Sequence, residues 1–133
     1  MKTIKDYIIY REFTVFRYKV GFTVSDNAFQ KECKKKNIKE YKPLISENNG
    51  ATTHWITAGN GEFLSIIGFN EKDLKRNNLP CLVDMIAHES FHAITFMLDQ
   101  IGEHNCSEEM YAYHIGELAG FLMNEIIKYW KNK

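Results

Sequence analysis

His88-Glu89-Ser90-Phe91-His92 lies in the middle of a predicted helix, from about Pro80 to Ile101, and has the spacing HExxH. Residues four apart stand one helical turn apart on the same face, so the two imidazoles can bind one ion from the same side. Glu89 is rotated by about 100° from His88, which places it to take a proton from a metal-bound water rather than to bind the ion. The motif therefore predicts a divalent metal site, most simply Zn2+, with Glu89 as the general base.

The same helix has apolar side chains on two sides and a polar stripe between them. The two sides consist of Leu82, Ile86, Ala93, Phe96 and Met97, and of Val83, Ala87, Phe91, Ile94, Leu98 and Ile101. We expect such a helix to be sandwiched in the core. Two histidines in its polar stripe would be costly to bury without partners, and a metal would satisfy their lone pairs. The alternative is that hydrogen bonds alone satisfy them, with no metal.

The remaining pattern predicts a single α+β domain over residues 1–133, with a small, mostly antiparallel sheet packed on the HExxH helix and on a C-terminal helix. Alternating apolar residues from Phe16 to Val24 indicate a half-buried strand. Two further β-prone runs, 53–57 and 62–69, flank a Gly-Asn-Gly turn that favours a hairpin. We also expect an extended segment over 7–13, a helix from Ser25 or Asp26 to about Lys36, a loop over 41–51, and a last helix over about 105–131.

The composition restricts the partners of the chain. Lys plus Arg and Asp plus Glu both number 17, so the net charge is zero and gives no general attraction to nucleic acid or anionic membranes. The lysine-rich segment 31–42 is interpreted as a solvated helix face rather than a binding patch. No apolar run is long enough for a membrane span, and no secretory signal is seen. Three cysteines without a CxxC element fit a reducing compartment, so we expect a soluble intracellular protein.

A zinc site needs a third protein ligand, and the last helix offers Glu108, Glu109 and His114. Small residues at four-residue spacing, namely Ala112, Gly116 and Gly120, predict the face that approaches the HExxH helix. Helical rotation places Glu109 within this face, Glu108 on its flank and His114 away from it. Glu108 also fits the third position of a capping box that starts at Asn105. We therefore favour Glu109, against the alternative of an exposed glutamate placed by the helix dipole.

Other polar residues near the motif carry weaker predictions. Tyr113 lies one turn from Glu109 and could donate to an oxyanion as a catalytic residue, although a core tyrosine with an exposed hydroxyl is the alternative. Tyr111 is predicted to point away from this face. His104 and Cys106 could bind metal as a pair, but a loop is the favoured interpretation, and His54 is interpreted as structural.

The HExxH motif, Gly102, and the segment Glu108–Gly116 together resemble small phage- and prophage-encoded zincin-like proteins. The resemblance covers about the last third of the chain strongly and the β-rich part only in general layout. It implies a zincin-like fold, the ligand set His88, His92 and Glu109 with Glu89 as base, and the activity of a metallopeptidase.

We therefore expect a zinc-dependent hydrolase, most simply a small peptidase that acts on a peptide or protein in the host cytoplasm or the virion. The substrate is expected along an edge strand, with 62–69 as the candidate. The alternative is a non-catalytic, metal-stabilised phage protein that binds a host or virion protein. The oligomeric state is left open.

Overall fold

The computed structural model describes residues 1–38, 41–46, 49–102 and 107–132. Its strands are β1 (Ile9–Phe13), β2 (Tyr18–Thr23), β3 (Ala51–Thr57) and β4 (Phe63–Phe69). Its helices are α1 (Asp26–Lys35), α2 (Glu71–Arg76), α3 (Leu79–Gln100) and α4 (Glu108–Lys131), with a 3-10 turn η1 (Thr14–Phe16) between β1 and β2. The predicted mixture of α and β structure is confirmed, and the predicted element boundaries agree to within about three residues.

The four strands form one sheet in the order β1-β2-β4-β3. The pairs β1–β2 and β3–β4 are antiparallel, and β2–β4 is parallel. The predicted turn between β3 and β4 forms as expected, with Gly61 at a φ of 87° that favours glycine. The expectation that 62–69 is an edge strand is wrong, because β4 is held between β2 and β3. Among the described strands, the edges are β1 and β3.

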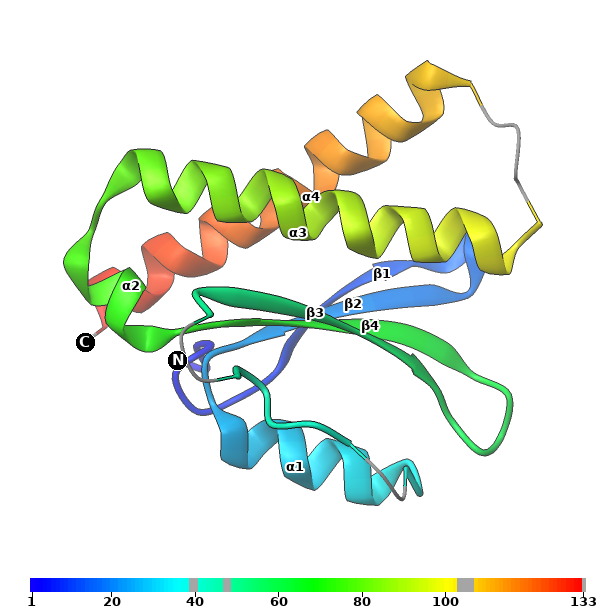
Figure 1. Ribbon diagram of the computed structural model, residues 1–133, viewed down its shortest axis with the longest axis horizontal. Helices are drawn as coiled ribbons and strands as arrows, with labels where there is room; N and C mark the ends of the chain where they lie inside the picture. Colours follow the sequence, from blue (N-terminus) through cyan, green and yellow to red (C-terminus); the bar gives the residue numbers. More distant parts are fainter. Residues whose placement is uncertain (39–40, 47–48, 103–106, 133) are drawn as a thin grey trace.

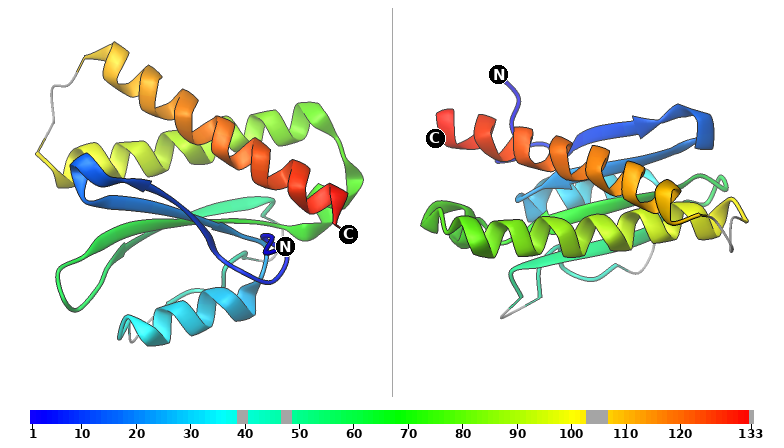
Figure 2. Two further views of the ribbon diagram at one scale, coloured as in Figure 1. Left: turned by 180° about the vertical axis from the view of Figure 1, so that it is seen from behind. Right: turned by 90° about the horizontal axis from the view of Figure 1, so that it is seen from above.

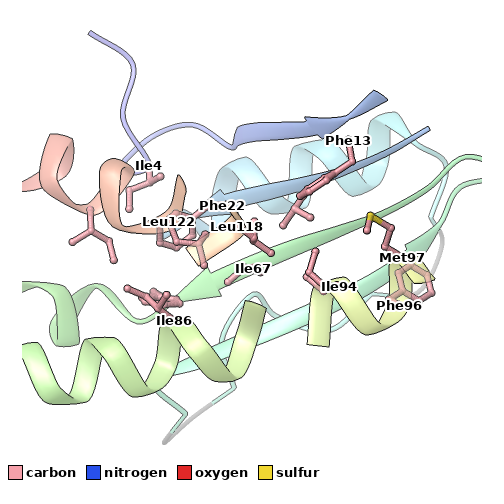
Figure 3. Close-up of a cluster of buried hydrophobic side chains, with 14 of the residues drawn as sticks. Ile4, Phe13, Phe22, Ile67, Ile86, Ile94, Phe96, Met97, Leu118 and Leu122 are labelled. Atoms are coloured by element: carbon pink, nitrogen blue, oxygen red, sulfur yellow. The ribbon is translucent and has the colours of Figure 1, made fainter. Parts of the chain in front are cut away.

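Helices cover both faces of the sheet, with α3 and α4 on one face and α1 on the other (Figures 1 and 2). Side chains from α3, α4 and the upper face of the sheet form the larger core cluster, with Phe22, Ile67, Ile86, Ile94 and Leu122 among its buried members (Figure 3). A smaller cluster around Phe29 and Ile66 fills the space under α1. Gly68 permits the close approach of the 41–46 segment, because a Cβ there would lie 2.5 Å from Leu44. No helix among the described residues has the length and apolar character of a membrane span.

The predicted cap of α1 and the predicted proline start of α3 are confirmed. Ser25 caps α1 by accepting a hydrogen bond from the Ala28 amide at 3.0 Å, and Asn78 caps α3 in the same way from Cys81 at 3.2 Å. Pro80 lies in the first turn of α3, where its missing amide proton costs no hydrogen bond.

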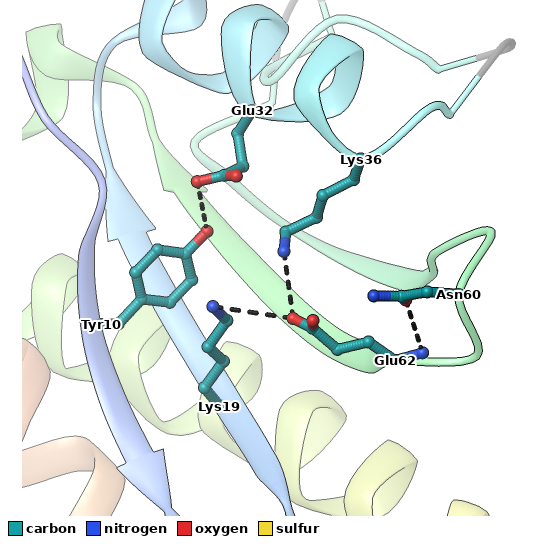
Figure 4. Close-up of polar contacts among 6 residues, drawn as sticks. All are labelled: Tyr10, Lys19, Glu32, Lys36, Asn60 and Glu62. Atoms are coloured by element: carbon teal, nitrogen blue, oxygen red, sulfur yellow. Dashed lines mark hydrogen bonds and ion pairs between the residues drawn. The ribbon is translucent and has the colours of Figure 1, made fainter.

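Part of the lysine-rich segment 31–42 has a structural role. Lys36, at the end of α1, binds Glu62 of the β3–β4 turn at 3.0 Å, and Lys19 of β2 approaches the same carboxylate oxygen at 3.6 Å (Figure 4). Beside them the Tyr10 hydroxyl donates to Glu32 at 2.9 Å. Lys31, Lys34 and Lys35 are exposed, as expected of a solvated helix face.

The Lys36–Glu62 pair gives a pH-dependent prediction. The hydrogen bond from Lys36 lowers the pKa of Glu62 below its usual 4.5 in the folded chain. The pair therefore stabilises the fold above pH 4.5, and this contribution is lost as the pH falls through the lower folded-state pKa. We expect Glu62→Gln to reduce the free energy of unfolding at pH 7 by at most about 1 kcal/mol, because the carboxylate is partly exposed.

Urea unfolding at pH 7 and at acidic pH measures this effect. The gap between Glu62→Gln and wild type should narrow in acid, and Glu12→Gln, which changes an exposed carboxylate of β1, should show no comparable gap at pH 7. A gap for Glu62→Gln that widens in acid would contradict the assignment.

Candidate metal centre

His88 and His92 bring their ring nitrogens together on the outer face of α3. The two Nε2 atoms are 3.1 Å apart, and the rings lie nearly perpendicular, at 77°. Two nitrogens bound to one tetrahedral zinc at about 2.0–2.1 Å lie roughly 3.3 Å from each other. The observed separation is therefore close to that of two ligands of one ion. It also fits an N–H···N hydrogen bond between neutral rings, which is the metal-free alternative.

Glu89 lies beside the imidazoles but not between them. Its side chain is buried, with the residue 6% exposed, and its Oε2 is 3.9 Å from His88 Nε2. The Thr53 hydroxyl of β3 donates to the other carboxylate oxygen at 2.7 Å. A buried carboxylate needs such a donor to offset its desolvation. The carboxylate is thus held beside the imidazole nitrogens by Thr53, which is compatible with the predicted role of Glu89 as a base.

Side chains from the sheet fix the backbone of the motif. Trp55 of β3 donates its indole N–H to the His92 carbonyl at 3.2 Å, and Tyr18 of β2 donates its hydroxyl to the Ala93 carbonyl at 2.8 Å. The Ser65 hydroxyl also contacts the Tyr18 oxygen. Burial raises the pKa of Tyr18 above its usual 10.0, so the phenol remains a donor at any ordinary pH. The motif turn of α3 is therefore anchored to two strands.

The expectation that α3 is buried on two apolar sides is wrong for the side that carries Val83 and Phe91. Leu82 and Ile86 are buried, but Val83 is 61% exposed and Phe91 is 50% exposed. The C-terminal half of α4 lies behind the N-terminal half of α3 rather than over it, and the N-terminal half of α4 rises away from α3, so the upper side of α3 is left uncovered (Figures 1 and 2). The second apolar side is covered only further along, at Ile94 and Leu98.

The features that favoured Glu109 do not hold in the structure. Gly116 and Gly120 are exposed, and a Cβ at either would meet nothing within 4 Å, so the small-residue face does not approach α3. Ser107, not Asn105, caps α4, which begins at Glu108. Asn105 lies outside the described residues, as do His104 and Cys106.

Glu108 and Glu109 are both exposed in the first turn of α4, where the helix dipole favours acidic side chains. Among the described residues, no group of three His, Cys, Asp or Glu side chains is arranged to hold one ion. The choice of Glu109 over Glu108 as the third ligand therefore stays a prediction. The described residues do not place Glu109 beside His88 and His92 as a ligand of the same ion.

Tyr111 of α4 faces α3 and Tyr113 is exposed, which is the reverse of the prediction. Tyr113 is 66% exposed and its ring contacts His114, whereas the Tyr111 ring lies 6.0 Å from that of Phe91 on α3. Met110, Tyr111, Ile115 and Leu118 mark the side of α4 that packs on the core. Within the described part of the chain, no ring contact or hydrogen bond joins Tyr113 to the imidazole pair, so its catalytic role stays a prediction.

The two other histidines in the described part of the chain lie apart from the motif. His54 packs on Phe29 with ring centroids 4.5 Å apart, and its Nε2 contacts the Leu44 carbonyl at 2.8 Å, which fits a structural role. Burial lowers its pKa below the usual 6.5. The ring of His114 lies 5.3 Å from that of Phe16, on the side of β1 and η1.

Comparison of the chain with protein-family models, with curated proteins and with solved structures finds no match. Functional assignment therefore depends on the residues of the site themselves.

Sequence reasoning missed Thr53 and Trp55. Both lie on one face of β3, two residues apart, so the alternation of the strand places them together. Their proximity to the motif depends on β3 being the edge strand beside α3, and that pairing is not visible in local sequence.

Thr53 offers a direct test of this arrangement. Thr53→Val keeps the shape of the side chain but removes the donor to a buried carboxylate, and we expect a loss of about 1–3 kcal/mol in the free energy of unfolding at pH 7. Thr53→Ser keeps the hydroxyl and should lose less. Chemical unfolding of the three proteins measures the difference, and a valine variant as stable as wild type would show that Glu89 does not depend on Thr53.

Proposed function

We propose that this chain is a small zincin-like, zinc-dependent hydrolase, most simply a peptidase. One observation carries the proposal: two imidazole nitrogens 3.1 Å apart face outward beside a buried carboxylate that a threonine holds in place. A pair of histidines kept only for packing would not need a desolvated carboxylate next to it. The mixed sheet with the motif helix across one face supports the zincin-like part of the proposal.

His88 and His92 would hold the metal through their Nε2 atoms. Bound zinc would polarise the substrate carbonyl and lower the pKa of the attacking water. The Glu89 carboxylate would take one proton from the attacking water as its oxygen adds to the carbonyl carbon. The same carboxylate would return that proton to the amide nitrogen as the C–N bond breaks, so that one water is consumed and two peptide products are released.

The free edge of β3 supports a peptide as the substrate. No other strand among the described residues pairs with that edge. An open pocket of about 480 Å3 lies between β3 and α1, on the side of the sheet opposite α3 (Figure 1), and is lined by residues 52–57 together with Phe29, Ile38 and Tyr41. Trp55 of this strand contacts the motif directly. An extended peptide that pairs with β3 would therefore lie next to the imidazoles.

Glu89→Gln tests catalysis separately from metal binding. The amide cannot accept a proton, so we expect hydrolysis to fall by a factor of at least about 10²–10⁴. Zinc content and the free energy of unfolding should stay near those of wild type, because Thr53 can still donate to the amide oxygen. The assay uses a mixed peptide library with product detection by mass spectrometry. Hydrolysis that survives the substitution would contradict the role of Glu89.

Glu109 and Glu108 form a matched pair for the third ligand. If Glu109 binds the metal, as the resemblance to zincin-like proteins implies, Glu109→Gln should weaken zinc binding by at least about tenfold. Glu108→Gln, which alters the neighbouring exposed carboxylate, should leave the affinity near that of wild type. Competition with a zinc-sensitive dye measures both. Equal affinities in the two variants would remove Glu109 from the ligand set.

A non-catalytic, metal-stabilised binding protein is the second candidate. The exposed apolar side chains along α3, which include Leu79, Val83 and Phe91, favour it because they form a stripe on one helix. A biological activity of the chain that persists in Glu89→Gln would support this second candidate over the peptidase.

A further inference from the structure

The imidazole pair is bordered by two exposed aromatic rings. The Trp55 ring lies 6.5 Å from the His92 ring, and the Phe91 ring lies 6.4 Å from it. Trp55 is 53% exposed and Phe91 is 50% exposed. The two residues come from different elements, β3 and α3, so their convergence on His92 is a product of the fold.

Each ring is held in place by partners of its own. The Trp55 indole stacks on Phe96 with an interplanar angle of 8° and donates to the His92 carbonyl. Phe91 lies against Tyr111 of α4 with ring centroids 6.0 Å apart. Apolar surface that is fixed before binding loses little conformational entropy when a ligand covers it. Both rings are therefore exposed apolar surfaces that are already fixed in position before a ligand binds.

Two exposed aromatic rings beside the imidazole pair favour contact with an apolar side chain. An aromatic or large aliphatic group would cover the exposed parts of both rings, whereas a polar group would lose its hydration there without a partner. An extended peptide that paired with the free edge of β3 would pass Trp55, and its alternate side chains would lie on the face of the sheet that bears α3.

We infer that Trp55 and Phe91 are the specificity-determining residues of the site and select peptides with a large apolar side chain, aromatic by preference, next to the imidazole pair. This inference rests on the proposed peptidase function. It adds a class of substrate, and it adds two residues that are neither proposed metal ligands nor the proposed general base.

The test uses two blocked nonapeptides that differ only in the central residue, phenylalanine in one and serine in the other. Binding is measured by calorimetry on zinc-loaded Glu89→Gln protein, and kcat/KM is measured on wild type. A Trp130→Phe background leaves Trp55 as the only tryptophan, so its fluorescence reports contact directly.

We expect the phenylalanine peptide to bind at least about tenfold more tightly, to change the emission of Trp55, and to be cleaved with the same preference. Trp55→Ala and Phe91→Ala should each remove most of the discrimination, whereas Trp55→Phe should keep part of it. Val15→Ala, which alters an exposed apolar residue of η1, is the matched control and should discriminate as wild type does. Zinc content checks that the imidazole pair is intact in every variant.

The outcomes separate the two claims. Selective binding without hydrolysis supports the specificity residues and counts against the peptidase, whereas hydrolysis without discrimination supports the peptidase and overturns the specificity residues. Equal binding of both peptides, or discrimination that survives Trp55→Ala and Phe91→Ala, overturns the inference. Absence of both binding and hydrolysis overturns both claims.

Discussion

Burial of one apolar side of α3 on the sheet is the constraint on which the site depends. Leu82, Ile86, Ala93 and Met97 can be removed from water together only at one rotation of the helix about its axis. That rotation turns His88 and His92 outward and turns Glu89 towards β3. A helix rotated by one residue would move the imidazoles by about 100° and break the contact between Glu89 and Thr53.

Strand β3 serves the site in more than one way. Its Thr53 hydroxyl satisfies the buried carboxylate, its Trp55 indole anchors the carbonyl of His92, and its outer edge is unpaired among the described strands. One strand thus supplies the hydroxyl that holds Glu89, the indole that anchors the motif helix, and an edge with no partner among the described strands.

The sequence was a good guide to local structure. The alternation in β2, the Gly-Asn-Gly turn, the serine cap of α1 and the motif helix all formed as predicted, because each depends on contacts between residues near in the chain. Statements about which elements meet were less successful. The 62–69 strand was assigned to an edge although it is central, and the helix was expected to be covered along both apolar sides although Val83 and Phe91 are exposed.

The C-terminal helix shows why rotation alone did not identify the packed side of α4. Small residues at four-residue spacing permit a close helix contact but do not require one, and in this chain Gly116 and Gly120 face solvent. The larger apolar residues Met110, Tyr111, Ile115 and Leu118 determine the packed side instead, because they remove more surface from water. Tyr111 therefore lies beside α3, where Tyr113 was expected.

Zinc titration of chelator-treated protein, made without a metal-affinity tag, tests the central claim most directly. The account predicts one bound zinc per chain, and the loss of that ion in His88→Ala and in His92→Ala while both variants stay folded, since His88 is largely exposed. A chain that binds no zinc, or binds it equally well without these imidazoles, would show that the HExxH turn of α3 is only a hydrogen-bonded surface.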